Sequence, residues 1–210
     1  MTRWRRLPDG EEGIAGASEA LARDGILAHP TATVYGLGAG TPAGDDRVRR
    51  LKGMDEERPL LRLAADAATL RACHPGLRWT EEAERLAGAF WPGPLTLVLD
   101  DGGPTGLGVR VEGHPETRAV LAAWGRTMSS TSLNRTGQAP AATADRARTA
   151  LDRLPETDGE PVRWLDAGDL PGSPPSTVLS LREGEPRILR AGAVGGDRLA
   201  AALGRELVGG

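Results

Sequence analysis

Short apolar runs alternate along this chain with longer segments rich in alanine, arginine and glutamate. Runs of β-branched and leucine side chains are typical of strands, and apolar positions that recur every third or fourth residue are typical of helices. The pattern predicts helices over residues 13–23, 44–52, 80–90, 115–124, 143–154 and 196–203. It predicts strands over residues 25–29, 60–64, 95–100, 108–111, 127–131, 162–166, 177–181 and 187–190. This alternation predicts a mixed α/β sheet with helices packed against it.

A few residues mark where these elements begin or end. Pro115 suits the first turn of a helix, and Thr143 suits an N-cap position. The Pro/Gly-rich stretches 101–106 and 170–175 are typical of turns, because strand-like runs resume a few residues later. The chain shows no internal repeat, and its 210 residues are enough for one compact core. We therefore expect one domain over residues 1–210.

Composition limits the classes of function. A formal net charge of −3 argues against a surface built as a whole for nucleic acid, although it is compatible with a local basic patch. The single cysteine, Cys73, excludes a disulfide framework and a cysteine-rich metal site. No apolar run approaches the ~20 residues that span a bilayer, and the N-terminal M-T-R-W-R-R lacks an apolar segment behind its charges. We expect a cytoplasmic protein that does not contact membranes.

Lys52 is the single lysine among 26 basic side chains. Where composition favours arginine this strongly, a surface lysine is easily replaced, whereas a compact ammonium group on a phosphate is not equivalent to a planar guanidinium. Lys52 is therefore a candidate phosphate ligand, with chance survival as the alternative. Nearby, Arg58 adds a second cation, and residues 55–57 offer three carboxylates of the kind that bind Mg²⁺. Ordinary solvated charge is the alternative for those acids.

Two segments offer polar groups for a ligand. Residues 29–38, H-P-T-A-T-V-Y-G-L-G, place two hydroxyls and two glycines after a predicted strand, where backbone amides can approach a phosphate. Residues 129–137, S-S-T-S-L-N-R-T-G, offer several hydroxyls and the Asn134 amide. Either segment could instead be a turn that needs glycine, serine or asparagine. The first is not a P-loop, because Gly-Lys-Ser/Thr is absent.

Three isolated basic side chains complete the candidates. Arg110 in G-V-R-V and Arg190 in I-L-R-A-G lie in apolar strands, where a buried guanidinium requires an anion to meet it. His114, which precedes Pro115, fits a structural or helix-start position better than a general base. The chain contains no H-E-x-x-H, no C-x-x-C and no Ser/His/Asp spacing, so zinc and hydrolase functions lack motif support.

Seven sequence blocks, taken in order, resemble the YrdC family, also called the threonylcarbamoyl-AMP synthase family. The blocks are P-T-A-T-V-Y-G-L-G, L-K-G-x-x-x-x-R-P-L, F-W-P-G-P-L-T-L-V-L, V-R-V-E-G-H-P, S-L-N-R-T-G, P-S-T-V-L and I-L-R-A-G. They cover residues 28–194, and the set is highly specific. The chain resembles the short bacterial form of the family. The resemblance implies a single-domain, twisted mixed α/β sheet with flanking helices that encloses a positively charged cavity.

The resemblance also implies a nucleotidyltransferase that condenses L-threonine, bicarbonate and ATP, with Mg²⁺, to threonylcarbamoyl-AMP and pyrophosphate. That product feeds the threonylcarbamoyladenosine modification of tRNA, which implies a tRNA-modifying transferase complex as partner and weak or transient tRNA binding. No side chain is implied as a metal ligand. By position, the catalytic residues would be Lys52, Ser132 and Asn134. The nucleotide would be bound by Lys52, Arg58, Asn134, Thr143 and Arg190. Threonine would be bound by Thr31, Arg110, Ser132 and Ser176.

The chain departs from the family pattern at three positions. The K-x-R motif reads Lys52-Gly53-Met54, so a thioether replaces a phosphate-facing arginine, and Ala32 and Leu133 replace a glutamate and an alanine. Losing one charge-assisted contact costs about 1.5–3 kcal/mol unless Arg50 or Arg58 replaces it. Two alternatives therefore stay open. One is a paralogue that forms a carbamoyl-adenylate of another amine in a biosynthetic pathway. The other is a non-catalytic nucleotide- or RNA-binding protein that uses the basic residues Arg47, Arg49, Arg50, Lys52 and Arg58.

Overall fold

The protein forms one mixed sheet flanked by helices. The computed structural model describes residues 3–55, 59–134, 139–156, 159–182, 185–205 and 207. Within these residues the sheet has ten strands in the order β1-β8-β2-β3-β7-β4-β6-β5-β9-β10. The pairs β1/β8, β8/β2, β4/β6 and β5/β9 are parallel, and the other neighbours are antiparallel. The mixed α/β fold expected from the sequence is confirmed.

The predicted elements agree with the structure to within two residues at each end. The strands are β1 (Trp4–Arg6), β2 (Ile26–His29), β3 (Gly36–Ala39), β4 (Leu61–Ala64), β5 (Leu95–Leu99), β6 (Leu107–Val111), β7 (Met128–Ser132), β8 (Val162–Trp164), β9 (Thr177–Ser180) and β10 (Arg187–Arg190). The helices are α1 (Glu11–Ala22), α2 (Pro42–Lys52), α3 (Ala67–Cys73), α4 (Glu81–Phe90), α5 (Pro115–Trp124), α6 (Ala144–Asp152) and α7 (Gly196–Leu203). Pro115 begins α5, and Thr143 caps α6 by accepting a hydrogen bond from the Arg146 amide, as expected.

Three elements were not predicted, namely β1, β3 and α3. Residues 30–35 form a loop after β2, as expected, whereas residues 36–38 of the predicted anion-binding segment belong to strand β3. Gly36 and Gly38 lie in this strand, which pairs antiparallel with β2 on one side and with β7 on the other. The two glycines therefore serve close strand packing, because a Cβ on Gly38 would lie 1.9 Å from the Ser129 carbonyl oxygen.

We expect Gly38→Ala to lower the free energy of unfolding by about 1–3 kcal/mol, because the added methyl group forces β3 away from β7. Gly88 is a matched control, since it lies inside α4 and a Cβ there meets nothing within 4 Å. Gly88→Ala should raise stability by about 0.5–1 kcal/mol. Urea denaturation of both variants tests the pair, and equal effects would contradict the close approach of the two strands.

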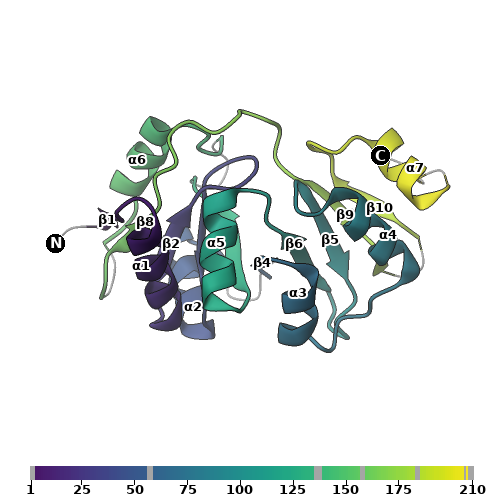
Figure 1. Cartoon of the computed structure of the whole chain (residues 1–210), viewed down its shortest axis with the longest axis horizontal. Coiled ribbons are helices and arrows are strands. Elements are labelled where there is room, and N and C mark those ends of the chain that lie inside the picture. Colours follow the sequence, from purple (N-terminus) through teal and green to yellow (C-terminus); the bar gives the residue numbers. More distant parts are fainter. Residues whose placement is uncertain are drawn as a thin grey trace.

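Strand β2 is covered by helices on both faces. Ile26 and Ala28 share a hydrophobic core with α2 and α6, whereas Leu27 between them shares another with α1 and α5. Figure 1 shows α1 beside α5 in this half of the molecule, and α4 and α7 in the other half. Because both faces are covered, all four residues of β2 are buried, and its first three are apolar without alternation.

Strand β5 is covered by helices on one face only. Leu95, Leu97 and Leu99 are buried in a core shared with α3, α4 and α7. Thr96 and Val98, which alternate with these leucines, line a cavity on the opposite face. Successive side chains of a strand point to opposite faces, so this alternation places the Thr96 hydroxyl on the face that lines the cavity. No helix in the described part of the chain is long and apolar enough to cross a membrane.

Candidate functional site

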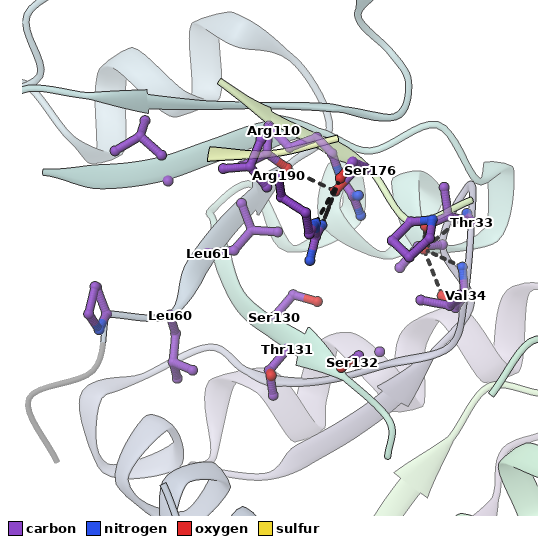
Figure 2. Close-up of a pocket in the computed structure, with 18 of the residues that line it drawn as sticks. Thr33, Val34, Leu60, Leu61, Arg110, Ser130, Thr131, Ser132, Ser176 and Arg190 are labelled. Carbon is purple, nitrogen blue, oxygen red and sulfur yellow. Dashed lines mark hydrogen bonds between the residues drawn. The ribbon is translucent and has the colours of Figure 1, made fainter. Parts of the chain in front are cut away.

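The candidate site is a cavity of about 510 Å³ that extends from β9 and β10 to the end of β7. Figure 2 shows Arg110, Ser176 and Arg190 on one side of it, with Ser130 and the end of β7 across from them. Its volume is typical of a site for a small molecule. Among the described residues that line it, two are arginines and none is acidic. The cavity is therefore suited to an anionic ligand.

The cavity brings together five residues that the sequence nominated. They come from segments far apart in the chain and are Thr31, Arg110, Ser132, Ser176 and Arg190. The order of the strands brings Arg110, Ser132 and Ser176 close together. The strands β7, β4, β6, β5 and β9 are consecutive in the sheet, although they are scattered along the sequence. The remaining nominated residues are described below.

Arg110 and Glu112 form a buried ion pair beside the cavity. The guanidinium Nη2 donates to the Glu112 carboxylate at 2.6 Å, and the two side chains are only 4% and 0% exposed. The other carboxylate oxygen accepts from the amides of Ala32, Gly113 and His114 at 2.8–3.0 Å. Burial alone would raise the pKa of Glu112, but Arg110 and the amides outweigh it and the pKa is lowered. Glu112 thus stays ionised and fixes Arg110 in place.

Arg110 retains one group for a ligand. Its Nε is buried and has no hydrogen-bond partner among the described residues. A buried donor without a partner is unfavourable, because it has lost water without gaining an acceptor. A ligand carboxylate or phosphate in the cavity would supply that acceptor.

Arg190 lies on the same side of the cavity and is held by Ser176. Its Nη2 donates to the Ser176 carbonyl oxygen at 2.7 Å and to the Ser176 hydroxyl at 3.0 Å. Burial, and then the charge of Arg110, lower the pKa of Arg190 from its ordinary value. Two like charges therefore repel each other in a cavity whose described lining contains no acid, and an anion between them would relieve the repulsion.

Thr31 shapes the cavity wall through its hydroxyl. The Thr31 Oγ1 donates to the Val34 carbonyl oxygen at 2.6 Å and accepts from the amides of Thr33 and Val34, both at 3.2 Å. Its one proton and its lone pairs are thus engaged within the turn that follows β2. Thr31 contributes to a ligand site by holding this turn in place.

His29 and Ser130 form a neutral pair behind the same wall. His29 is fully buried, and burial lowers its pKa to about 4. The His29 Nδ1 lies 3.3 Å from the Pro30 carbonyl oxygen, which can only accept, so this nitrogen carries the proton. The Nε2 is then an acceptor for the Ser130 hydroxyl at 3.3 Å. Ser130 consequently presents oxygen lone pairs to the cavity and can accept a hydrogen bond from a ligand amine or hydroxyl.

Lys52 and Asn134 line a second cavity, of about 760 Å³, beside the first. The Lys52 Nζ donates to the Thr131 hydroxyl at 3.2 Å and to the Ser132 carbonyl oxygen, which ties the end of α2 to the end of β7. Asn134 accepts a hydrogen bond from the Ser132 hydroxyl. Ser132 thus links the two cavities, because it lines the first and bonds to residues of the second.

Two further nominated residues are Thr143 and Arg58. Thr143 lines neither cavity, and its hydroxyl is engaged as the cap of α6. Arg58 and two of the three clustered acids, Glu56 and Glu57, lie outside the described residues. Among the described residues no group of three acids, histidines or cysteines could hold a metal ion. His114 precedes α5 as its N-cap residue, as expected.

Comparison with known proteins identifies the family. Residues 19–192 match the Sua5/YciO/YrdC family, which is described as "Telomere recombination". The chain belongs to this family. A threonylcarbamoyl-AMP synthase of Chromohalobacter salexigens is 39% identical over 192 residues, which cover 85% of this chain and 98% of the relative. The threonylcarbamoyl-AMP synthase of Bacillus subtilis is 29% identical over 94% of this chain.

A solved Sua5/YciO/YrdC structure agrees with the fold. The P. abyssi Sua5 complexed with L-threonine has a TM-score of 0.82 and 27% sequence identity, and the match covers 99% of this chain. The chain spans 62% of the length of that protein and 58% of the length of the B. subtilis relative.

One of the three departures from the Sua5/YciO/YrdC pattern lines the first cavity. Met54 lines this cavity and packs, partly buried, against the hydrophobic core to which α2 contributes. Leu133 is buried in that core and lines the second cavity. Ala32 lines neither and donates its amide to Glu112. Of the three departures, only the one at residue 54 therefore changes a side chain that lines the first cavity.

Sequence reasoning assigned no role to six polar residues that line the first cavity of this family member, namely Thr33, Tyr35, Thr96, Thr105, Ser130 and Thr131. Thr33 and Ser130 lie in segments that had been singled out, but without an assigned role. Thr96 could have been found from the pattern L-T-L-V-L, because a lone hydroxyl between leucines of a strand faces away from the core. Its Oγ1 lies 3.2 Å from the Ser176 hydroxyl.

Proposed function

We propose that this chain makes threonylcarbamoyl-AMP and pyrophosphate from L-threonine, bicarbonate and ATP. The observation that carries the proposal is a cavity whose described lining contains no acid and in which Arg190 and Arg110, whose Nε has no partner among the described residues, face the hydroxyls of β7. Relatives named threonylcarbamoyl-AMP synthase, and a Sua5 complexed with L-threonine, support this assignment.

Threonine occupies the side of the cavity next to Arg110 in this proposal. Its carboxylate accepts hydrogen bonds from the Arg110 Nε and from the Ser176 hydroxyl, and Arg190 adds a second positive charge. The Ser130 hydroxyl, which already donates to His29, accepts from the threonine amine. A neutral His29 suits this role, because a charged imidazolium would repel an ammonium group.

The reaction then needs placement and charge more than proton transfer. The threonine ammonium group first releases a proton to solvent, the neutral amine then attacks the carbon of bicarbonate, water leaves, and a carbamate anion forms. A carbamate oxygen forms a bond to the α-phosphorus of ATP while the bond between that phosphorus and the bridging oxygen breaks, and pyrophosphate leaves with the electron pair. Lys52, Ser132 and Asn134 stand at the end of β7 to hold the phosphates. Fixed donors in a cavity shielded from water favour this displacement.

Mg²⁺ enters this proposal as part of MgATP. The described residues around the two cavities offer no carboxylate cage, and Mg²⁺ is commonly bound through substrate phosphates with water completing its shell. The protein side chains therefore supply positive charge and hydroxyl groups, and the substrate brings its own metal.

The product would be consumed by a tRNA-modifying transferase complex in the cytoplasm. A mixed anhydride of a carbamate and a phosphate reacts with water, so a nearby acceptor enzyme is required. We expect only weak or transient binding of tRNA itself, because the net charge of −3 opposes nonspecific attraction to phosphates.

We expect threonine-dependent pyrophosphate release from MgATP and bicarbonate, and we expect Lys52→Ala to lower kcat/KM for ATP by about 10- to 100-fold. The ammonium group of Lys52 lies at the junction of the cavities, where charge on the leaving phosphates is neutralised. Met54→Arg should keep or raise the rate, since it adds a cation beside the first cavity. A coupled pyrophosphate assay measures both.

Arg148→Ala is the control for these variants, because Arg148 is exposed, pairs with Asp145 and lines neither cavity. It should leave the rate unchanged. Release of pyrophosphate that does not depend on threonine, or that is insensitive to Lys52→Ala, would contradict the proposal.

A second candidate function follows from Met54. A thioether at this position makes the cavity less polar, which favours a paralogue that acts on another amine. The same assay with a set of amines distinguishes the two functions. Faster release with an amine other than threonine would favour the paralogue, and fastest release with threonine would exclude it.

A further inference from the structure

The second cavity is strongly basic. It lies between the end of α2, the end of β7 and one face of α6. Its described lining contains no acidic residue and four cations, which are Arg50, Lys52, Arg146 and Arg153. Unlike most surface arginines of this protein, Arg50, Arg146 and Arg153 make no side-chain hydrogen bond or ion pair within the described residues.

Helix geometry directs two of these arginines to the cavity. Arg146, Ala150 and Arg153 are spaced by four and three residues, so they lie on one face of the helical turn. Arg148 falls on the opposite face, where it pairs with Asp145 at 3.0 Å. The arginines on the cavity face therefore remain available to a ligand, whereas the arginine on the solvent face is paired.

The apolar part of the cavity lining strengthens the attraction between these cations and a bound anion. Leu51, Leu133 and Ala141 are buried residues that form part of this lining. An apolar lining keeps water and its screening away from one side of a bound ion, which makes each charged contact stronger than at an open surface. A compact anion with several charges fits such a site best.

Strand β7 joins this cavity to the first one. Thr131 and Ser132 line the first cavity, and the next two residues, Leu133 and Asn134, line the second. Lys52 bridges the junction by bonding to Thr131 and Ser132. A phosphate chain held at Ser132 would have the threonine side of the first cavity on one side and the second cavity on the other.

We propose that the second cavity receives the pyrophosphate that the reaction releases. In phosphoryl-type displacement, the attacking and leaving oxygens lie roughly in line across the phosphorus. With the carbamate on the Arg110 side and the α-phosphate at Ser132 and Lys52, the bond that breaks points toward Arg50, Arg146 and Arg153. This inference rests on the proposed function for the identity of the ligand, and the basic cavity itself is independent of it.

Direct binding tests the site without any turnover. Isothermal titration with inorganic pyrophosphate is expected to show binding to the wild type, and about 10- to 100-fold weaker binding to the Arg146→Gln/Arg153→Gln double variant. Arg148→Gln is the matched control, because it removes an arginine from the opposite face of the same helix. It should bind pyrophosphate like the wild type. Thermal melting of all three proteins establishes that the variants are folded.

Product inhibition gives a second readout. Pyrophosphate should inhibit the double variant at about 10- to 100-fold higher concentration than the wild type, whereas the KM for threonine should not change. Unchanged pyrophosphate binding in a folded double variant would overturn the inference even if threonine-dependent turnover is found. Loss of binding in the double variant would support the basic site even if that turnover is absent.

An RNA strand is the competing ligand. The same titration with tRNA distinguishes the two ligands. If the cavity binds pyrophosphate, the wild type and the double variant should bind tRNA with equal affinity. Binding of tRNA that depends on Arg146 and Arg153, with no binding of pyrophosphate, would overturn the inference.

Discussion

Glu112→Ala is expected to lower the free energy of unfolding by about 3–5 kcal/mol. The substitution leaves the Arg110 guanidinium buried without its carboxylate, and Arg110 is only 3% exposed. It also removes the acceptor of three backbone amides, those of Ala32, Gly113 and His114. An uncompensated buried charge is among the most destabilising changes in a protein interior, because the charge has lost water and its partner.

Denaturant unfolding at neutral pH measures this effect. Glu116→Ala is the control, because Glu116 is an exposed acid in the first turn of α5, and its removal should change stability by less than about 0.5 kcal/mol. The double variant Glu112→Ala/Arg110→Met should regain part of the loss, since it removes the orphaned charge as well. Equal stability of Glu112→Ala and Glu116→Ala would show that the ion pair does not support the fold.

Lowering the pH from about 6.5 to 4 is expected to reduce the free energy of unfolding by about 3 kcal/mol through His29 alone. Burial lowers the pKa of His29 to about 4 in the folded protein, whereas an unfolded histidine titrates near 6.5. Between these values the unfolded chain binds a proton that the folded chain rejects, so acid favours unfolding. The nearby charges oppose one another, because Glu112 raises the pKa while Arg110 and His114 lower it.

The difference between wild type and His29→Phe isolates this contribution. Carboxylates also titrate in acid, but their effect is shared by the two proteins and cancels in the comparison. His29→Phe also changes the free energy of unfolding at neutral pH, since Ser130 loses its acceptor. The decisive quantity is therefore the slope of the free energy of unfolding against pH. Parallel slopes for the two proteins between pH 4 and 6.5 would contradict a buried neutral His29.

The elements that sequence alone located are those with a clear apolar period. Strand β5, with leucines at alternate positions, and helix α5, which starts at Pro115, are examples. Strand β3 was missed because Gly-Leu-Gly-Ala carries little strand propensity, and only its neighbours β2 and β7 make it a strand. Short β1 was missed for a similar reason, since its pairing with the distant β8 stabilises it.

The sequence allowed many residues of the candidate site to be predicted, but not how those residues are arranged in space. Arg110 and Arg190 were nominated as isolated cations in apolar runs and Ser176 by the family resemblance, and the strand order brings them together. Thr143 was nominated for the nucleotide but serves as a helix cap outside both cavities. The separation of Lys52 and Asn134 into a second cavity depends on how α2 and α6 pack, which no local pattern encodes.

The repulsion between Arg110 and Arg190 sets a compromise between folding and binding. Each guanidinium raises the electrostatic energy of the other, and the pKa of Arg190 is lowered first by burial and then by the charge of Arg110. A sequence selected only for a rigid fold would replace one of them with a neutral side chain. Their joint presence lowers the free energy of unfolding of the protein without a ligand. An anion bound between them raises that free energy.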